Sequence, residues 1–357
     1  MDQTEKFLQA LTNAHGIPGY ETEVRAVLRD FMAPLGAVTH DKLGSLICHQ
    51  TANVDDAPRI MLVGHMDEIG FMVTHITKEG FLKFLQLGGW WDQVLLGHRV
   101  IIKTSQGDVT GIIGAKPPHM LDADERKKIV EKKDMYIDIG ATSRKAVEAA
   151  GVRVGDAVVP DSQFIILTDG KTYAAKAFDN RIGCAVAIDA LRHFRDQPAP
   201  AHLYGVATVM EEVGVRGATT SVRAIDPDVA IILESDIAGD VPGIKAEQSD
   251  VKMGGGPTVM LYDARMIPNI KLRNLVIDTA KELEIPLQFS AMPGGATDGA
   301  AIHLHGTGVP TVVIGVPARH IHSHSAIIHR DDYDNAVKLV TVVVAKLDRP
   351  TVDSLTA

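Results

Sequence analysis

The 357-residue sequence is poor in cysteine, has no long uninterrupted apolar run, and carries an excess of acidic charge. Its two cysteines, Cys48 and Cys184, are too few for a disulfide framework or for the paired spacing of a zinc finger. No apolar stretch approaches the length that a helix needs to cross a bilayer. A formal net charge of −9 argues against a general nucleic-acid or membrane surface.

Several common catalytic motifs are also absent: there is no HExxH, no GxSxG and no phosphate loop of the GxxxxGKS type. Hydrophobic residues make up 45% and charged residues 23%, a globular balance that permits a sizeable core. The length suits one large domain with an insert, or two domains. The first residues, MDQTEKFLQALTNAHG, are typical of an amphipathic helix rather than a signal peptide, so we expect a cytoplasmic protein.

The most informative stretch is Leu203–Gly217, LYGVATVMEEVGVRG, where an apolar run ends in Glu211 and Glu212 and is followed by glycines. It predicts a buried strand that delivers both acids to the carboxyl edge of a sheet, where catalytic groups of open α/β sheets collect. Adjacent carboxylates are costly unless a positive charge holds them. A metal ion would let one act as a ligand and leave the other free as a base. The alternative is a solvated Glu pair at a strand end.

Other predicted strands lead into the same kinds of residue. The short apolar run Arg59–Gly64 is followed by His65, with Asp67 placed to orient its imidazole. Asp228–Leu233 and Thr311–Val316 are two further buried strands. The ends of the predicted strands therefore carry a set of acids and histidines, namely His65, Glu211, Glu212, Glu234, Asp236 and His322.

Asp179 opens a predicted helix that runs to about Phe194, so its ordinary role would be to cap that helix. Beside the other acids and histidines, however, it fits a two-metal hydrolase. Two dications about 3.5–4 Å apart require a bridging carboxylate and terminal His and carboxylate ligands. His320, His322 and His324 alternate, and their spacing leaves open which of them binds metal. The ligand types suit zinc, cobalt or manganese.

Residues 69–165 have a different texture, with short strands such as Arg99–Thr104 between Gly- and Pro-rich turns. They include one charged segment, Asp122–Lys133, that is expected to be helical. Trp90 and Trp91 are expected to be core residues, with an exposed loop or an interface as the alternative. We predict that 69–165 form a small β domain that interrupts an α/β domain made of 1–68 and 166–357.

Nine short motifs occur in order along the chain: VGHMDEIGFMV, GAKPPH, DIGATSR, VGDAVVP, AFDNRIG, EEVGVRGA, IAGDVPGI, GATDGAAIH and IHSH. In this order they resemble metallopeptidase family forty-two, which contains the glutamyl aminopeptidases and the tetrahedral aminopeptidases. Any one motif is weakly diagnostic, but the ordered set is specific. The similarity runs from about Gly16 to the final helix and covers nearly the whole chain.

The resemblance implies a role for each matching residue. His65 and Glu234 would be terminal ligands of one metal, and Glu212 and His322 would serve the other. Asp179 would bridge both metals. Glu211 would be the general base that acts on the attacking water, and Asp67 would steady the His65 ligand.

Two positions depart from the family's pattern. The ligand at Glu234 is commonly Asp in this family, so Asp236, two residues further on, is the alternative. The residue two before the ligand His322 is usually Tyr and is His320 here, which affects the expectation about substrate or metal preference.

The resemblance implies a mixed-sheet α/β aminopeptidase domain flanked by helices, with the small β domain inserted. The expected reaction is removal of the amino-terminal residue from short peptides, with two divalent ions per chain. Zinc is the expected metal, and cobalt or manganese are the alternatives. A homo-oligomer is expected, with a tetrahedral dodecamer as the family's form. The preferred amino-terminal residue stays open, and Lys245, Lys252 and Arg319 are the cationic candidates for an acidic preference.

Two other classes of function remain as alternatives. One is a metal-independent carbohydrate hydrolase of the endoglucanase type, although paired acids on one strand end suit a glycosidic bond poorly. The other is a catalytically silent assembly protein, although the candidate site residues are intact.

Overall fold

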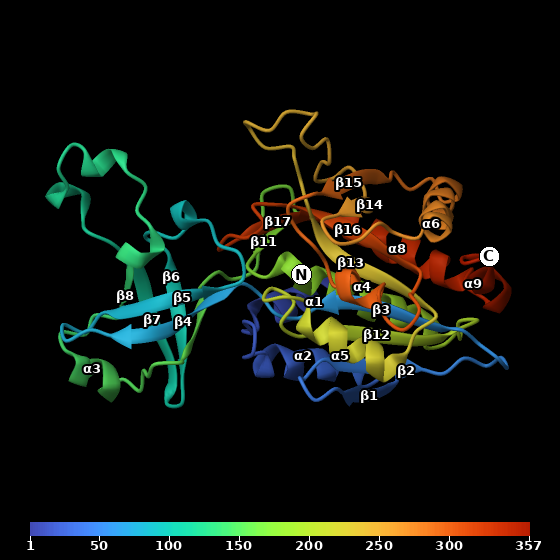
Figure 1. The fold of residues 1–357 in the computed structure, drawn as a ribbon, viewed down its shortest axis with the longest axis horizontal. Coiled ribbons are helices and arrows are strands. Elements are labelled where there is room, and N and C mark those ends of the chain that lie inside the picture. The colour runs from blue at the N-terminus through green and yellow to red at the C-terminus, as the bar shows by residue number, and fades with distance from the viewer.

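The computed structural model describes residues 1–357, which form a large α/β part and a small closed β-barrel (Figure 1). The large part is built on an eleven-stranded mixed sheet whose main strand order is β1-β2-β12-β3-β13-β16-β17-β11-β10, with β14 joining β16 and β15 joining β14. These strands are β1 (Ala37–His40), β2 (Leu46–Gln50), β3 (Arg59–His65), β10 (Ile165–Ile166), β11 (Thr172–Ala175), β12 (His202–Thr208), β13 (Val229–Ile237), β14 (Thr258–Asp263), β15 (Gln288–Met292), β16 (Thr311–Arg319) and β17 (Ala326–His329).

The middle of the sheet is parallel: β12 pairs with β3, β3 with β13, and β13 with β16, all in the same direction. These strands are continuous apolar runs because helices cover both of their faces. Their carboxyl ends consequently meet at one edge of the sheet, and that edge carries the candidate site.

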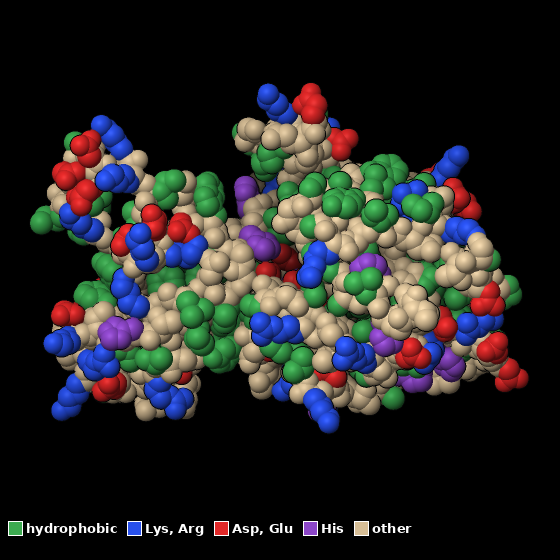
Figure 2. All heavy atoms as spheres, viewed as in Figure 1, with side chains coloured by type: hydrophobic (Ala, Val, Ile, Leu, Met, Phe, Trp, Pro, Cys, Tyr) green, Lys and Arg blue, Asp and Glu red, His purple; other side chains and the backbone are tan.

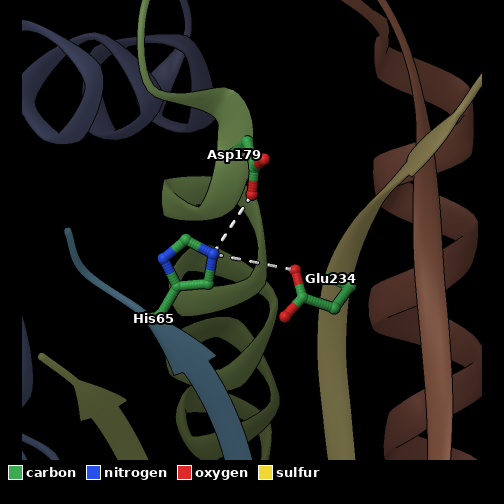
Figure 3. Close-up of side chains that lie close together, drawn as sticks. All are labelled: His65, Asp179 and Glu234. Atoms are coloured by element: carbon green, nitrogen blue, oxygen red, sulfur yellow. Dashed lines mark hydrogen bonds and ion pairs between the residues drawn. The ribbon is translucent and has the colours of Figure 1, made fainter. Parts of the chain in front are cut away.

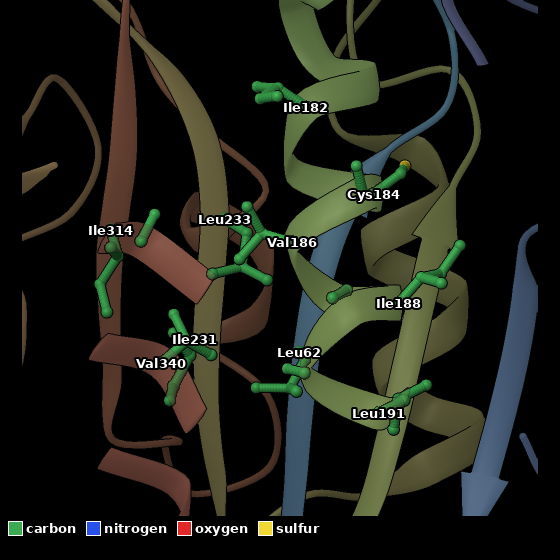
Figure 4. Packing of buried hydrophobic residues seen from close by; sticks show 14 of the residues in the cluster. Leu62, Ile182, Cys184, Val186, Ile188, Leu191, Ile231, Leu233, Ile314 and Val340 are labelled. Atoms are coloured by element: carbon green, nitrogen blue, oxygen red, sulfur yellow. The ribbon is translucent and has the colours of Figure 1, made fainter. Parts of the chain in front are cut away.

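Alternate residues of β3 face the two helical layers. Ile60 and Leu62 belong to the larger core, whereas Met61 and Val63 belong to the smaller core on the opposite face. Figure 4 shows Leu62 beside residues of α4 (Phe178–Phe194), the helix that packs most centrally on the sheet. The other helices are α1 (Gln3–Asn13), α2 (Thr22–Met32), α6 (Ile270–Glu282), α8 (Arg330–Ala345) and α9 (Arg349–Ser354) on the α4 side, and α5 (Arg216–Ile225) and α7 (Gly299–Ile302) on the other.

The barrel has its own apolar core, which includes Phe71, Ile102 and Ile137. Its strands close in the order β4-β5-β8-β7-β6-β9, so that no sheet edge is left open. They are β4 (Gly70–Ile76), β5 (Leu82–Leu87), β6 (Arg99–Thr104), β7 (Gly107–Gly114), β8 (Tyr136–Asp138) and β9 (Ala157–Pro160), and a short helix α3 (Arg144–Ala149) follows β8. The predicted fold class, a mixed sheet flanked by helices with a small inserted β unit, is confirmed.

Two local expectations are corrected by the structure. Asp122–Lys133 is not an α-helix. It contains only short 3₁₀ turns, one at Glu125–Lys127 and one at Lys132–Asp134 that extends past its end. The segment is mostly exposed and has no apolar face to bury, and a helix of about a dozen residues is marginal in water without packing. Trp90 is buried as expected for a core residue, but Trp91 is 61% exposed.

None of the helices combines the length and the apolar character that crossing a membrane would require.

Candidate metal centre

The structure brings the predicted site residues together at the carboxyl edge of the parallel strands. His65 is the last residue of β3, and Glu234 lies near the end of β13. Glu212 follows β12 after a short turn, and His322 follows β16. Asp179 comes from the first turn of α4, opposite these strand ends. Figure 3 shows the carboxylates of Asp179 and Glu234 both directed at the same ring nitrogen of His65.

Two groups of three potential ligands share Asp179. One consists of His65, Asp179 and Glu234, the other of Asp179, Glu212 and His322, and the ligand atoms within each group lie within 4.8 Å of one another. Oδ1 of Asp179 is 3.1 Å from Nε2 of His65, and Oδ2 is 3.1 Å from Nε2 of His322. Each oxygen of this carboxylate thus faces a different group.

Asp179 does not cap its helix. The N-cap position of α4 is Ala177, no side chain makes a capping hydrogen bond there, and the backbone at Asp179 departs from helical angles. The carboxylate is therefore directed away from the backbone amides of the helix and toward the two imidazoles.

The protein alone does not supply enough positive charge to balance the buried carboxylates of the site. Burial raises the pKa of Glu211 and Glu234 well above the usual range, and it raises the pKa of Glu212 to about 8, with Asp179 adding to the effect. Oε1 of Glu212 is buried without a hydrogen-bond partner. Divalent cations would relieve both conditions, so the donor set fits His- and carboxylate-bound metal ions.

The pKa values of the two imidazoles are raised as well, but by the neighbouring acids and against the effect of burial. Burial works to lower the pKa of His65, but Glu211, Asp179 and Asp67 raise it well above its usual value. Burial also opposes protonation of His322, and Asp179 with Glu212 nevertheless raises its pKa to about 10. The acids thus attract positive charge of any available kind, and protons take that place when no cation is bound.

Glu211 belongs to neither group of ligands. Its Oε2 lies 3.8 Å from Nε2 of His65, and its side chain is 11% exposed. Among the acids of this site it is therefore the carboxylate that remains available for proton transfer.

Asp67 acts on the adjacent glutamates as much as on His65. Its two carboxylate oxygens accept hydrogen bonds from the backbone amides of Glu211 and Glu212, at 3.0 and 3.1 Å. Nδ1 of His65 is 3.1 Å from the backbone carbonyl oxygen of Asp67 and 3.5 Å from its carboxylate. Asp67 thereby positions both Glu211, which lies outside the two ligand groups, and Glu212, a member of the second group.

Three residues that act on the site, two by contact and one by its charge, were not predicted from the sequence. Glu21, which precedes α2, is buried and accepts a hydrogen bond from the amide of Met210, directly before Glu211. The carbonyl oxygen of Gly89, in the barrel part, lies 2.8 Å from Nδ1 of His322. Asp298 is buried close enough to raise the pKa of Glu211 by its charge, after the effect of burial itself. No spacing pattern links Glu21 or Gly89 to the site, because these contacts join segments that are distant in sequence, and the motif that contains Asp298 does not indicate which residue its charge affects.

The alternative ligand positions have different surroundings in the structure. Asp236 is hydrogen-bonded to the Thr258 hydroxyl at 2.6 Å and belongs to neither ligand group, whereas Glu234 does. Of the three alternating histidines, His322 faces Asp179, His324 is buried against other aromatic rings, and His320 is exposed.

An open cavity of about 980 Å³ lies over the two ligand groups. Figure 2 shows acidic side chains and histidines in a hollow near the middle of the visible face. The segments 246–251 and 289–297 form much of its wall, and Arg265 is its cationic side chain. Lys245, Lys252 and Arg319 do not line it, and Arg319 is ion-paired with Asp240.

Known proteins match nearly the whole chain consistently. The sequence profile of the M42 glutamyl aminopeptidase family matches residues 44–339. A protein of Escherichia coli strain K12 with the provisional name aminopeptidase FrvX is 42% identical, covering 94% of this chain and 93% of its own. The glutamyl aminopeptidase of Lactococcus lactis is 34% identical, with 96% of each chain covered.

Solved structures agree with the sequence matches. The TET aminopeptidase of a marine-sediment Thaumarchaeota archaeon has a TM-score of 0.97 at 50% identity, with 99% of both chains covered. The Pyrococcus horikoshii TET1 peptidase, which can assemble into a tetrahedron or a large octahedral shell, has a TM-score of 0.87 at 30% identity, covering 97% and 100% of the two chains. A Thermotoga maritima protein described as an endoglucanase has a TM-score of 0.78 at 29% identity, covering 98% and 99%.

Proposed function

Because the chain belongs to the M42 glutamyl aminopeptidase family, and is therefore a metal-dependent hydrolase, we propose that it is a two-metal aminopeptidase acting on short peptides. The observation that carries the proposal is the position of Asp179 between two ligand groups, with Glu211 left out of both. The resemblance seen in the sequence to family forty-two is confirmed by the family match.

In this proposal, one metal ion is held by His65 and Glu234 and the other by Glu212 and His322, with Asp179 bridging them. The distances between ligand atoms and the raised pKa values of the glutamates support the assignment. Two dications per chain are proposed, with zinc as the first candidate and cobalt or manganese as alternatives.

When bound, the cations polarise the carbonyl of the scissile peptide bond and lower the pKa of a water. Glu211 accepts the proton of the attacking water and passes it to the leaving amine, so that the carboxylate is regenerated at the end of the reaction. Asp67 holds the backbone of Glu211 in position through the hydrogen bond to its amide. The acids of the site also provide a place for the free α-amine of the substrate, which accounts for action at the amino terminus.

The barrel is proposed to be a separate domain, residues 69–165, inserted into a catalytic domain made of 1–68 and 166–357. The barrel strands begin at Gly70 and end at Pro160, which supports these boundaries. We also propose a homo-oligomer, with a tetrahedral dodecamer as its first candidate. The P. horikoshii relative, which forms a tetrahedron or an octahedral shell, supports this proposal.

The activity test is a panel of aminoacyl chromogenic substrates, applied to the metal-free protein after adding back zinc, cobalt or manganese separately. Hydrolysis that appears only with added metal is the expected result, and the panel identifies the preferred amino-terminal residue. Hydrolysis of a β-glucan in the presence of a chelator, without peptidase activity, would instead indicate the endoglucanase alternative. A protein that takes up metal but cleaves no substrate would indicate the silent alternative.

A further inference from the structure

His322 is held by the barrel part through a backbone carbonyl. Its Nδ1 lies 2.8 Å from the carbonyl oxygen of Gly89, on the loop that follows β5. A carbonyl oxygen only accepts hydrogen bonds, so Nδ1 carries the hydrogen of this contact. In the neutral ring, Nε2 is then left with its lone pair directed at Asp179 and Glu212. This is the tautomer that a metal ligand requires.

Two glycines let this loop approach the ligands. A Cβ atom on Gly88, whose φ is +84°, would lie 3.0 Å from Oε2 of Glu212 and 2.4 Å from a methyl carbon of Ile69. A Cβ atom on Gly89 would lie 3.0 Å from Nδ1 of His322. A side chain at either position would therefore press on a proposed ligand.

Aromatic contacts fasten the loop on both sides. Trp90 is buried, stacks on Phe71 with ring centroids 4.8 Å apart, and donates its indole N–H to the carbonyl of Gly70 at 3.2 Å. On the other side, Trp90 packs against His324 with centroids 5.3 Å apart. The loop thus lies between the wall of the barrel and the segment that carries His322.

His324 completes this packing as an aromatic ring rather than as a polar group. It is 4% exposed, and neither of its ring nitrogens has a hydrogen-bond partner. Its ring stacks on that of His98, which belongs to the barrel part, with centroids 3.9 Å apart and an interplanar angle of 16°. The two parts of the molecule are therefore joined by a ring contact close to His322.

We propose that the barrel completes the metal centre: the Gly89 carbonyl fixes the tautomer and orientation of His322, and Trp90 and the His98–His324 pair are positioning residues that hold Gly89 in place. The inference rests on the proposed function, because it takes His322 as a ligand. It makes the two metal sites unequal. The site of His322 depends on the barrel, whereas Nδ1 of His65 is bonded to a carbonyl next to its own strand, in the large part.

The test is calorimetric titration of Co²⁺ into the metal-free full-length protein. Gly89→Ala and Trp90→Leu should weaken one of two binding steps about 10–100-fold and leave the other unchanged, as is usual when a partner of a ligating histidine is lost. His98→Ala should weaken the same step several-fold, and it keeps the fold because His98 is exposed. His98→Phe, which preserves the ring stack, and Trp91→Leu, at the exposed neighbouring tryptophan, should match wild type.

His322→Ala identifies the step. It should remove the step that Gly89→Ala weakens, and adding Gly89→Ala to His322→Ala should then have no further effect on the remaining step. Circular dichroism and the thermal midpoint of each variant separate loss of binding from loss of fold, and His98→Ala carries the test if Trp90→Leu unfolds.

Equal weakening of both steps, or unchanged binding in Gly89→Ala, would overturn the inference and leave the two-metal aminopeptidase intact. Wild-type protein that binds fewer than two Co²⁺ ions would instead refute the proposed function, and the inference with it. Two wild-type steps of which one is lost selectively in the barrel variants would support both.

Discussion

The buried carboxylate of Glu68 is the ion-pair partner of two buried cations, so its neutralisation should destabilise the protein strongly. Its Oε1 lies 2.5 Å from Nζ of Lys176 and 3.3 Å from Nη2 of Arg181, and it accepts a hydrogen bond from the amide of Gly16 at 3.2 Å. All three charged side chains are at most 2% exposed. The Glu68→Gln variant keeps the shape of the side chain and removes its charge.

The size of the effect follows from the individual contacts. Burial lowers the pKa of Lys176 from 10.5 to about 8 even with Glu68 present, a penalty of about 3.4 kcal/mol at pH 7. Without the carboxylate the lysine would be neutral in the folded state. Deprotonating a lysine of normal pKa costs about 4.8 kcal/mol at pH 7, which is about 1.4 kcal/mol more than the penalty in the wild type. Replacing a charged acceptor for Arg181 and Gly16 costs about 1.5–3 kcal/mol more. The expected loss is therefore about 3–4 kcal/mol, within the usual range for a broken buried pair.

The assay is urea unfolding followed by circular dichroism at fixed protein concentration. The matched control is Glu282→Gln, which breaks the exposed pair with Lys346 and should cost no more than about 1 kcal/mol. Between pH 8 and 10.5 the unfolded chain holds a proton that the folded wild-type chain has released at Lys176, so stability should rise with pH. The lysine part of the Glu68→Gln deficit should then disappear above about pH 8. A deficit at pH 7 as small as that of the control would refute the reasoning.

Four further results are expected at the site. Glu211→Gln should lower kcat about 10²–10⁴-fold with metal content intact, whereas Glu212→Gln should lose a metal and partly recover at high metal concentration; the reverse pattern would exchange the two roles. Asp179→Asn should weaken both metal sites, and elemental analysis showing full double occupancy would contradict the bridge. Asp67→Asn should lower kcat/KM about 10–100-fold, because the NH₂ group of an amide cannot accept one of the two hydrogen bonds from the backbone N–H groups of Glu211 and Glu212. Unchanged kinetics would show that these two hydrogen bonds are not needed for activity. Metal binding should release protons and weaken as the pH falls from 8 to 6, because the pKa values of Glu212, about 8, and His322, about 10, leave both side chains protonated at pH 7. Calorimetry in two buffers of different ionisation enthalpy measures the number of protons released. A metal affinity that does not change with pH would contradict this prediction.

The parallel core of the fold was predictable because its strands are continuous apolar runs. The acids and histidines at their ends were predictable for the same reason, since parallel strands end at one edge. The charged segment Asp122–Lys133 was wrongly predicted as helix, because its composition favours a helix but no tertiary surface covers it. Helix propensity alone does not stabilise a segment of this length in water when no packing surface covers it.

The finer geometry of the site was beyond the sequence. Alternation could not distinguish His322 from His324, because the chain there leaves the strand and His322 adopts a positive φ of 57°. The contact of Gly89 with His322 involves a backbone carbonyl, which every residue possesses and no motif marks. Glu21 likewise acts on Met210 across 189 positions of sequence. Such contacts depend on how the two parts dock, which composition and periodicity do not encode.

The order in which the site residues occur along the chain bears on when activity can arise during synthesis. The candidate ligands extend from His65 to His322, and β16, which leads to His322, can pair with β13 only after nearly the whole chain has been made. The barrel, by contrast, is continuous in sequence and can close much earlier. A growing chain would thus display a folded barrel beside an incomplete site. The candidate ligands can therefore come together as a complete set only near the end of synthesis, when β16 and the segment that carries His322 join the sheet.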